Sequence, residues 1–456
     1  MSLKKVSESF AFKIVFTGIL SLALLIPLTM VSGIVTERES RRASAVSEVS
    51  GKWGGDQTII GPVLTVPYRR YYRDEKNVTR MTIENAYFLP DTLAIDGTIV
   101  PEKRSRGLYE VILYRIEELS ILGRFSVPDF SRLRIAEKDI LWEEACLTVG
   151  IPDTRGIQQR VSLTWDRKAI PFLPGVRGCG LYQSGIHAFI RDIRSGGRSF
   201  DFAMEFSIQG SSSLSFAPLG QETTVRLRSS WPHPSFTGAY LPSTRKITKK
   251  GFEAGWKVSY FGRNFPQEFT DDKEIKPAET AFGVALYQPV DFYQKCVRAV
   301  KYGFLFISLT FLCFFLFEVF MGLKIHPLQY LMVWSALCLF YLLFLSLSEY
   351  MNFIVSCLAA SAGVIAMITG YSVKVLKTRK RGGIMAGLLT ALYAYLFLLV
   401  QNEDYTLLLG SVALFVILGA VMYITRSLDW YRVRLNPQAQ PAIQDPPVPP
   451  RGHDFE

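Results

Sequence analysis

Residues 302–323 read YGFLFISLTFLCFFLFEVFMGL, an apolar run that holds a single charged side chain, Glu318. An α-helix needs about 20 residues of this kind to cross the roughly 30 Å hydrocarbon core of a bilayer. A helix of a water-soluble protein would show a polar face over this length, which the run lacks. Residues 302–323 therefore predict a transmembrane helix.

Similar apolar runs occur at residues 14–34, 328–347, 353–373, 384–400 and 405–424. The first could instead be a cleaved signal peptide, because Lys4 and Lys5 precede it. Its apolar part is too long for that, and the small residues Ala43-Ser44-Ala45 lie too far beyond it to form the cleavage site. We therefore expect six transmembrane helices: an N-terminal anchor at 14–34 and a five-helix bundle at 301–424.

Basic residues indicate the orientation, because Lys and Arg in short loops resist translocation across the membrane. The short loops expected to lie outside hold only acidic charges, whereas the loops on the other side and both chain ends hold the cations Lys4, Lys5, Lys13, Lys324, Lys374, Lys377, Arg379, Lys380, Arg381, Arg426, Arg432, Arg434 and Arg451. The pattern predicts cytoplasmic segments at 1–13 and 425–456. Residues 35–300 then form one large domain on the outer side of the membrane.

The pattern of residues 35–300 favours β-strands. Segments 62–68, 108–114, 161–165, 202–208 and 256–260 are rich in β-branched and aromatic residues, and Gly, Pro, Asp and Ser separate them. The clearest helical periodicity lies at 130–144 and in the membrane-entry stretch 291–301. A β-rich, sandwich-like domain is predicted, and a loose repeat of YFLP (87–90) as YLP (240–242) leaves two related β-lobes as an alternative.

Charge and composition limit the classes of function. The formal net charge of +11 is divided between the cytoplasmic segments and a large domain, so it predicts no nucleic-acid binding. An anionic-lipid or polyanion patch stays open as an alternative. The tail at 425–456 is rich in proline and poor in apolar residues, which predicts a disordered cytoplasmic segment.

Motifs of catalysis and cofactor binding are missing. The chain has no H-E-x-x-H, C-x-x-C, G-x-S-x-G, P-loop or G-x-G-x-x-G pattern. We therefore expect no enzyme activity, no metal and no cofactor. Cys146 and Cys179 are the cysteines well inside the outer domain, and a disulfide between them stays open.

Candidate interaction residues come from two segments of the outer domain. Trp231 and His233 belong to WPHPSF (231–236), whose prolines would hold the imidazole on a stiff, exposed segment. This segment is either a structural turn with an aromatic plug or a contact for a ligand or partner. Arg104 and Arg106 precede a predicted strand, and they are either a solvated edge or a site for an anionic headgroup.

Glu318 is the candidate inside the membrane. Ionisable groups within transmembrane segments often belong to functional sites. Glu318 also lies near the end of its run, so it could instead reach the interface or pair with Lys324.

Several ordered segments resemble the CreD family of bacterial inner-membrane proteins, which are cell envelope integrity proteins. The matching segments are GPVL (61–64), RGLYEV (106–111), LSFAPLG (214–220), WPHPSF (231–236), NFPQ (264–267) and EDY (403–405). The resemblance implies that the outer domain at 35–300 is periplasmic and that the protein acts in envelope integrity or the envelope stress response. It supplies no catalytic residues. Membrane lipids and an envelope protein are then the expected partners. The alternative is a transporter or lipid-handling protein for a small or amphipathic ligand.

Overall fold

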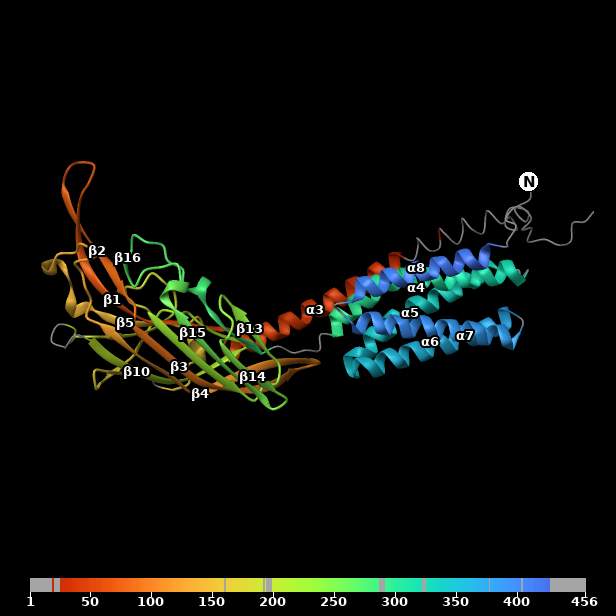
Figure 1. Cartoon of the computed structure of the whole chain (residues 1–456), viewed down its shortest axis with the longest axis horizontal. Helices are drawn as coiled ribbons and strands as arrows, with labels where there is room; N and C mark the ends of the chain where they lie inside the picture. Colours follow the sequence, from red (N-terminus) through yellow and green to blue (C-terminus); the bar gives the residue numbers. More distant parts are fainter. Residues whose placement is uncertain are drawn as a thin grey trace, which may run out of the picture. The chain divides into compact units, whose positions relative to one another are not determined.

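The computed structural model describes residue 19 and residues 25–159, 161–191, 193, 199–286, 292–321, 325–376, 378–402 and 405–426. The chain divides into two compact units (Figure 1). Met1–Ser40 together with Asp291–Glu456 form the helical unit, and Arg41–Val290 form the β unit. The expected combination of apolar helices with a large β-rich domain is confirmed.

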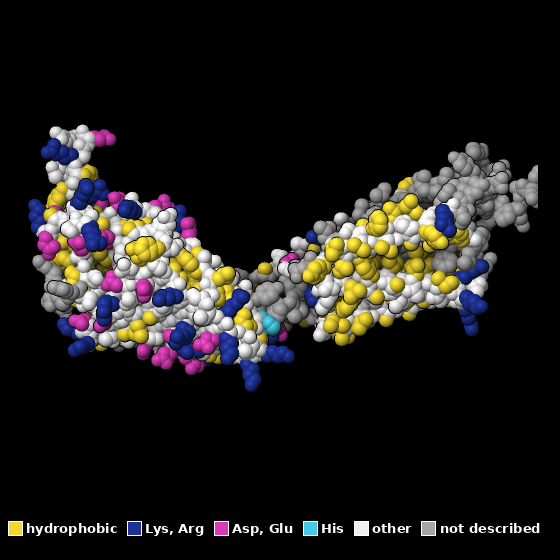
Figure 2. All heavy atoms as spheres, in the orientation of Figure 1, with side chains coloured by type: hydrophobic (Ala, Val, Ile, Leu, Met, Phe, Trp, Pro, Cys, Tyr) yellow, Lys and Arg dark blue, Asp and Glu magenta, His cyan; other side chains and the backbone are white. Residues whose placement is uncertain are grey.

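Five helices in the described part of the helical unit are long and apolar enough to cross a membrane. They are α4 (Phe292–Met321), α5 (Pro327–Tyr350), α6 (Phe353–Val375), α7 (Arg379–Gln401) and α8 (Thr406–Thr425). Capping side chains fix two of their starts: His326 accepts a hydrogen bond from Leu328 N, and Asn352 accepts one from Ile354 N. Hydrophobic side chains dominate the surface of this unit, whereas charged side chains dot the β unit (Figure 2).

The N-terminal helix runs further than the apolar run predicts. Most of residues 14–24 lie outside the described residues, and from Leu25 the chain forms α3 (Leu25–Trp53). The helix continues past residue 34, the expected end of the membrane span, because residues 35–50 contain neither Gly nor Pro to stop it. One continuous helix therefore leads from the apolar segment into the β unit. The 425–456 tail lies outside the described residues, apart from its first two positions.

The described strands of the β unit form two sheets. The nine-stranded sheet has the order β13 (Pro234–Gly238), β17 (Phe282–Leu286), β11 (Ser213–Phe216), β1 (Gln57–Arg73), β5 (Cys146–Gly150), β9 (Gly185–Phe189) and β8 (Leu173–Pro174), with β2 (Thr79–Phe88) on β1 and β16 (Glu268–Thr270) on β2. The eight-stranded sheet has the order β14 (Thr244–Thr248), β15 (Gly251–Ser259), β12 (Glu222–Ser229), β3 (Thr92–Arg106), β4 (Tyr109–Ser126), β10 (Ser199–Ser211), β6 (Ser162–Trp165) and β7 (Lys168–Pro171).

The two sheets pack against each other around one core. Side chains of β12 alternate between exposed and buried, as expected for a sheet with one dry face. Across the core, the rings of Trp256 and Phe282 lie 5.6 Å apart, and Tyr114 OH donates to Ser213 O at 2.8 Å. Each contact joins a strand of one sheet to a strand of the other. The predicted sandwich-like packing is thus present.

The alternative of two β-lobes is not what the structure has. Residues 41–290 form one compact unit with one hydrophobic core. Strands from the two halves of the sequence interleave, since β12 pairs in parallel with β3 and β11 pairs in parallel with β1. Two lobes would instead keep each half's strands together.

The helical periodicity at 130–144 is another wrong prediction. This segment holds only the short 3-10 turns Glu137–Asp139 and Trp142–Glu144. Arg134 has a φ of 57°, which interrupts any regular helix. Phe130 and Trp142 pack edge to face with ring centroids 5.2 Å apart, so their apolar spacing serves the core instead of a helix face.

Both cysteines of the β unit are free thiols. Cys146 is buried, and its Sγ lies 3.3 Å from Arg177 O. Burial raises the pKa of the Cys146 thiol to about 12 and also raises the pKa of Cys179. Neither thiol is therefore an activated nucleophile.

A first prediction follows from this division of the chain. Residues 41–290, expressed alone, should fold, because their core and sheets are complete without the helices. Circular dichroism should give a β-type spectrum with a cooperative thermal transition. A mainly helical spectrum, or a melt without cooperativity, would contradict an independent β unit.

Candidate functional site

Arg104 and Arg106 lie together at the β3–β4 hairpin, and both contact the end of α3. The Arg104 guanidinium lies 4.0 Å from the ring centroid of Trp53, and its Nε lies 2.9 Å from Glu102 Oε1. Arg106 Nη2 lies 2.8 Å from Glu48 Oε1. Both side chains are exposed but paired, so they join the hairpin to the helix and form no free anion site.

The carboxylates of this junction are held in their charged form. The hydrogen bond from Arg104, followed by that from Arg115, lowers the pKa of Glu102. The hydrogen bond from Lys52 lowers the pKa of Glu48, to which Arg106 adds a smaller effect. A lowered carboxyl pKa stabilises the fold above the usual value near 4.5, and the contribution disappears as the pH falls through the lowered value.

A tight corner joins α3 to β1. Gly54 has a φ of 143°, and a Cβ there would lie 2.8 Å from Gln209 O, so only glycine fits. Gly55 N donates to Asp153 Oδ2 at 2.9 Å. Gln57 Nε2 donates to the carbonyls of Asp153 at 2.9 Å and Gln209 at 3.1 Å. These bonds fix the direction in which the helix passes into the sheet.

Trp231 and His233 have different surroundings. Trp231 is only 8% exposed and belongs to the hydrophobic core, with Lys103 Nζ 5.7 Å from its ring centroid. His233 is exposed, as the sequence predicts. The burial of Trp231 favours the aromatic plug over an accessible partner contact at this residue. Lys103 and Arg104 are neighbours in β3, so the Trp231 ring lies close to the hairpin that carries Arg104.

Glu318 is buried in the helical unit, with 1% of its surface exposed. Its Oε2 accepts a hydrogen bond from Tyr330 OH at 2.9 Å, and its Oε1 lies 3.4 Å from Ile325 N. Both contacts lead from α4 to the start of α5. Lys324, the predicted partner, lies outside the described residues. Glu318 thus connects two successive helices, which favours a structural role.

The sequence analysis missed a ribbon formed by the ends of β1 and β2. Residues 69–73 pair with residues 79–83, and the hairpin projects from the β unit (Figure 1). Exposed fractions of its large apolar side chains lie between 48% and 55%, for Tyr71, Tyr72, Met81 and Ile83. We call residues 69–83 the β1–β2 ribbon.

One face of the ribbon combines apolar and cationic side chains. Tyr71 pairs with Met81 and Arg69 pairs with Ile83, so these four side chains lie on the same face. Lys and Arg side chains are visible on the projecting ribbon (Figure 2). Aromatic residues, Met and Arg are the types enriched at protein interfaces. The signal in the sequence was RRYYR at 69–73, in which exposed aromatics follow a buried strand.

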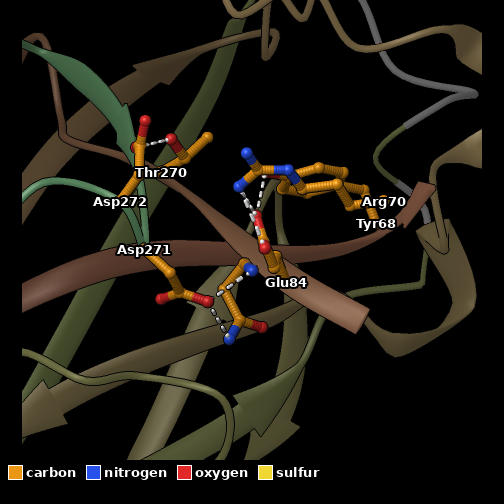
Figure 3. A network of polar contacts seen from close by, with 7 residues as sticks. Tyr68, Arg70, Glu84, Thr270, Asp271 and Asp272 are labelled. Atoms are coloured by element: carbon orange, nitrogen blue, oxygen red, sulfur yellow. Dashed lines mark hydrogen bonds and ion pairs between the residues drawn. The ribbon is translucent and has the colours of Figure 1, made fainter. Parts of the chain in front are cut away.

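A polar network fastens the base of the ribbon (Figure 3). Glu84 Oε2 accepts from Tyr68 OH at 2.8 Å and from Arg70 Nη1 at 3.0 Å. Asp271 Oδ2 accepts from Asn85 N at 2.7 Å and from Asn85 Nδ2 at 3.0 Å. Burial, reinforced by the hydrogen bond to Glu84, raises the pKa of Tyr68, which remains a donor at neutral pH. The ribbon therefore projects from a rigid base.

Neither place has the groups that metal binding requires. Across the described residues, no three His, Cys, Asp or Glu side chains gather in a way that could hold a metal ion. The junction consists of ion pairs and one cation–π contact. The ribbon exposes large apolar side chains to solvent.

Comparison with known proteins gives one consistent result. The profile of the family described as "Inner membrane protein CreD" matches residues 9–431. Inner membrane protein CreD of Escherichia coli (strain K12) is 32% identical over 421 residues, which cover 91% of this chain and 92% of that protein. Two crystal structures of a mutant M1 zinc metallopeptidase from Deinococcus radiodurans, one with a bound peptide substrate, each cover 43% of this chain at 10% identity and a TM-score of 0.18. A TM-score this low supports no conclusion about fold or activity.

The junction gives a second prediction, tested by a double-mutant cycle of Trp53→Ala and Arg104→Ala. The ring and guanidinium contact should give a coupling free energy of about 0.5–1 kcal/mol, as exposed cation–π pairs do. Thermal or denaturant unfolding of the β unit measures it. Trp53→Ala combined with Arg226→Ala, an exposed arginine on β12, is the control and should give additive effects. Additive effects of Trp53→Ala and Arg104→Ala would contradict a stabilising contact between the Trp53 ring and the Arg104 guanidinium.

Glu318 gives a third prediction. Glu318→Gln keeps an acceptor of the same size for Tyr330 OH and should leave the thermal stability of the detergent-solubilised protein nearly unchanged. Glu318→Leu leaves Tyr330 OH and Ile325 N without this acceptor, and should destabilise by about 1–3 kcal/mol. If Gln destabilises as much as Leu, the charge itself matters and the structural interpretation fails.

Proposed function

Because the chain belongs to the CreD family of inner membrane proteins, we propose that it maintains the integrity of the cell envelope as a multi-pass scaffold without catalysis. In this proposal the β unit lies in the periplasm and both chain ends lie in the cytoplasm. The scaffold acts by holding an envelope protein at the β1–β2 ribbon. The partner's identity is left to experiment.

The orientation rests on the distribution of charge around the helices. Lys374, Arg379 and Lys380 lie where α6 leads to α7, and all three are exposed. Basic residues in so short a connection favour the cytoplasmic side. The β unit precedes α4 and follows α3, so with α6 ending in the cytoplasm it falls on the periplasmic side.

The ribbon is the observation that carries the scaffold proposal. One face holds exposed Tyr71, Met81 and Ile83 on a rigid base, away from the hydrophobic core. Removing half-exposed apolar side chains from water costs little free energy. Contacts with aromatic residues and Arg supply much of the binding energy at interfaces. A protein with an acidic rim around an apolar pocket would fit this face.

The transporter alternative has less support. A carrier driven by ions usually presents several ionisable groups to a pathway. Glu318 instead makes contacts at the α4–α5 connection, where Tyr330 donates to it. We therefore retain the scaffold as the proposed function.

A fourth prediction tests the orientation. Reporter fusions placed after Val373 and Ile424 should report the cytoplasm, and fusions after Leu347 and Val400 should report the periplasm. Paired alkaline phosphatase and fluorescent protein fusions give opposite signals at each position. A periplasmic signal after Val373 would overturn the proposed orientation.

A fifth prediction tests the ribbon. Tyr71→Ser with Met81→Ser should abolish complementation of an envelope-stress phenotype in cells that lack the gene. Because both side chains lie outside the core, membrane insertion and the thermal transition should be retained. Leu241→Ser with Ile247→Ser is the matched control, since both residues are large, apolar and exposed elsewhere on the β unit. Full complementation by the ribbon variant, or equal loss in the control, would sink the proposal.

A further inference from the structure

A groove runs between α6 and α7 on the outside of the helical unit. It encloses a volume of about 790 Å³. Four of the residues that line it are alanines: Ala362 and Ala366 from α6, and Ala386 and Ala394 from α7. Their small side chains leave room between two helices that otherwise pack directly. Ala362, Ala366 and Ala394 are exposed, so the groove opens outward.

The lining of the groove is mainly apolar, with a few hydroxyl side chains. Both helices are long and apolar enough to cross a membrane, so an outward opening faces lipid. The lining runs along α6 from Cys357 to Thr369. At 1.5 Å per residue this is roughly 18 Å, slightly more than half of the ~30 Å hydrocarbon core. One hydrocarbon chain of a lipid fits a groove of this length and character.

A cationic turn lies beyond one end of the groove. Thr369 and Ala386 line that end, and α6 and α7 are joined a short distance further on. Lys374, Arg379 and Lys380 are exposed there, and no carboxylate pairs with them among the described residues. Cationic pockets between transmembrane helices at the membrane surface attract anionic lipid headgroups.

The turn itself is held in place by a hydrogen bond. Arg381 is half-buried, and its Nη1 donates to Leu376 O at 3.2 Å, which closes the end of α6. The neighbouring cations are thereby presented from a fixed backbone. About one and a half helical turns separate Thr369 from Lys374, a spacing similar to the interfacial layer between headgroup and hydrocarbon.

One polar atom in the groove lacks a partner. Thr369 Oγ1 is buried and makes no hydrogen bond within the structure. A buried hydroxyl without a partner is costly, and native structures usually satisfy it with a ligand or water. Thr369 lies at the end of the groove nearest the cations, where the ester oxygens of a phospholipid would be found. An acceptor from the ligand would complete its hydrogen bonding.

We propose that the groove between α6 and α7 binds an anionic phospholipid. One acyl chain occupies the groove, an ester oxygen accepts a hydrogen bond from Thr369, and the phosphate lies against Lys374, Arg379 and Lys380. A helix from a second copy would fill the same groove but would leave the cations and the Thr369 hydroxyl unused. The lipid accounts for all three features together.

The test uses the full-length protein in detergent with equal amounts of phosphatidylglycerol and phosphatidylcholine, analysed by native mass spectrometry. Phosphatidylglycerol should be retained in preference. Replacing Lys374, Arg379 and Lys380 by Gln should weaken its binding at least tenfold, since each cation near the headgroup contributes about fivefold. Replacing Lys246, Lys249 and Lys250 of the β unit by Gln removes the same charge elsewhere and should change binding less than twofold.

A second variant tests the groove itself. Ala366→Phe places a ring where the acyl chain would lie and should reduce lipid retention about tenfold, whereas Ala420→Phe on the exposed face of α8 should not. If Ala366→Phe fails to accumulate, Ala394→Phe blocks the same groove from α7.

Three outcomes would overturn the proposal. One is equal retention of the two lipids, and another is retention that survives both the charge and the groove variants. The third is a protein dimer without bound lipid that Ala366→Phe dissociates, which would assign the groove to a second copy of the chain.

Discussion

Backbone amides and carbonyls that are removed from water must find partners within the chain, and in the β unit the strand β1 meets this requirement on the largest scale. It pairs with β2, β5 and β11, and its residues from Gln57 to Tyr68 are almost all buried. Its first residue belongs to the corner that receives α3, and its last residues form the ribbon. The corner, part of the core and the ribbon therefore share one strand.

The sequence predicts the apolar helices of the helical unit well, but it does not predict how far α3 continues into polar sequence. An apolar run reports where hydrocarbon can lie, and the helices α5 to α8 begin and end close to the predicted limits. It does not report where a helix stops in water, so α3 reaches Trp53 within polar sequence, whereas the start of α4 at Phe292 agrees with the helical periodicity at 291–301. The pairing of β12 with β3 was equally out of reach, because parallel strands from distant segments leave no local pattern.

In the candidate site, the sequence identifies unusual residues but not the side chains that surround them. The sequence marks Arg104, Trp231 and Glu318 as unusual, and the structure gives each a nearby partner: Trp53, Lys103 and Tyr330 respectively. The partners of Arg104 and Trp231 could not be inferred from spacing, since each pair joins distant segments. The ribbon went unrecognised for the opposite reason: its residues resemble the rest of a strand, and only their exposure after Tyr68 sets them apart.

The ribbon also has open edges. In the part of the chain that the structure describes, residues 69–73 pair only with β2, and residues 79–83 pair only with β1. Unpaired edges are templates for sheet extension between molecules, and natural proteins protect them with charged side chains. Arg69, Arg73 and Lys76 give every copy the same positive charge at this edge. In a crowded membrane, where proteins diffuse in a plane and meet repeatedly, this repulsion would keep neighbouring copies from joining into fibrils while leaving the edge open to a partner of opposite charge.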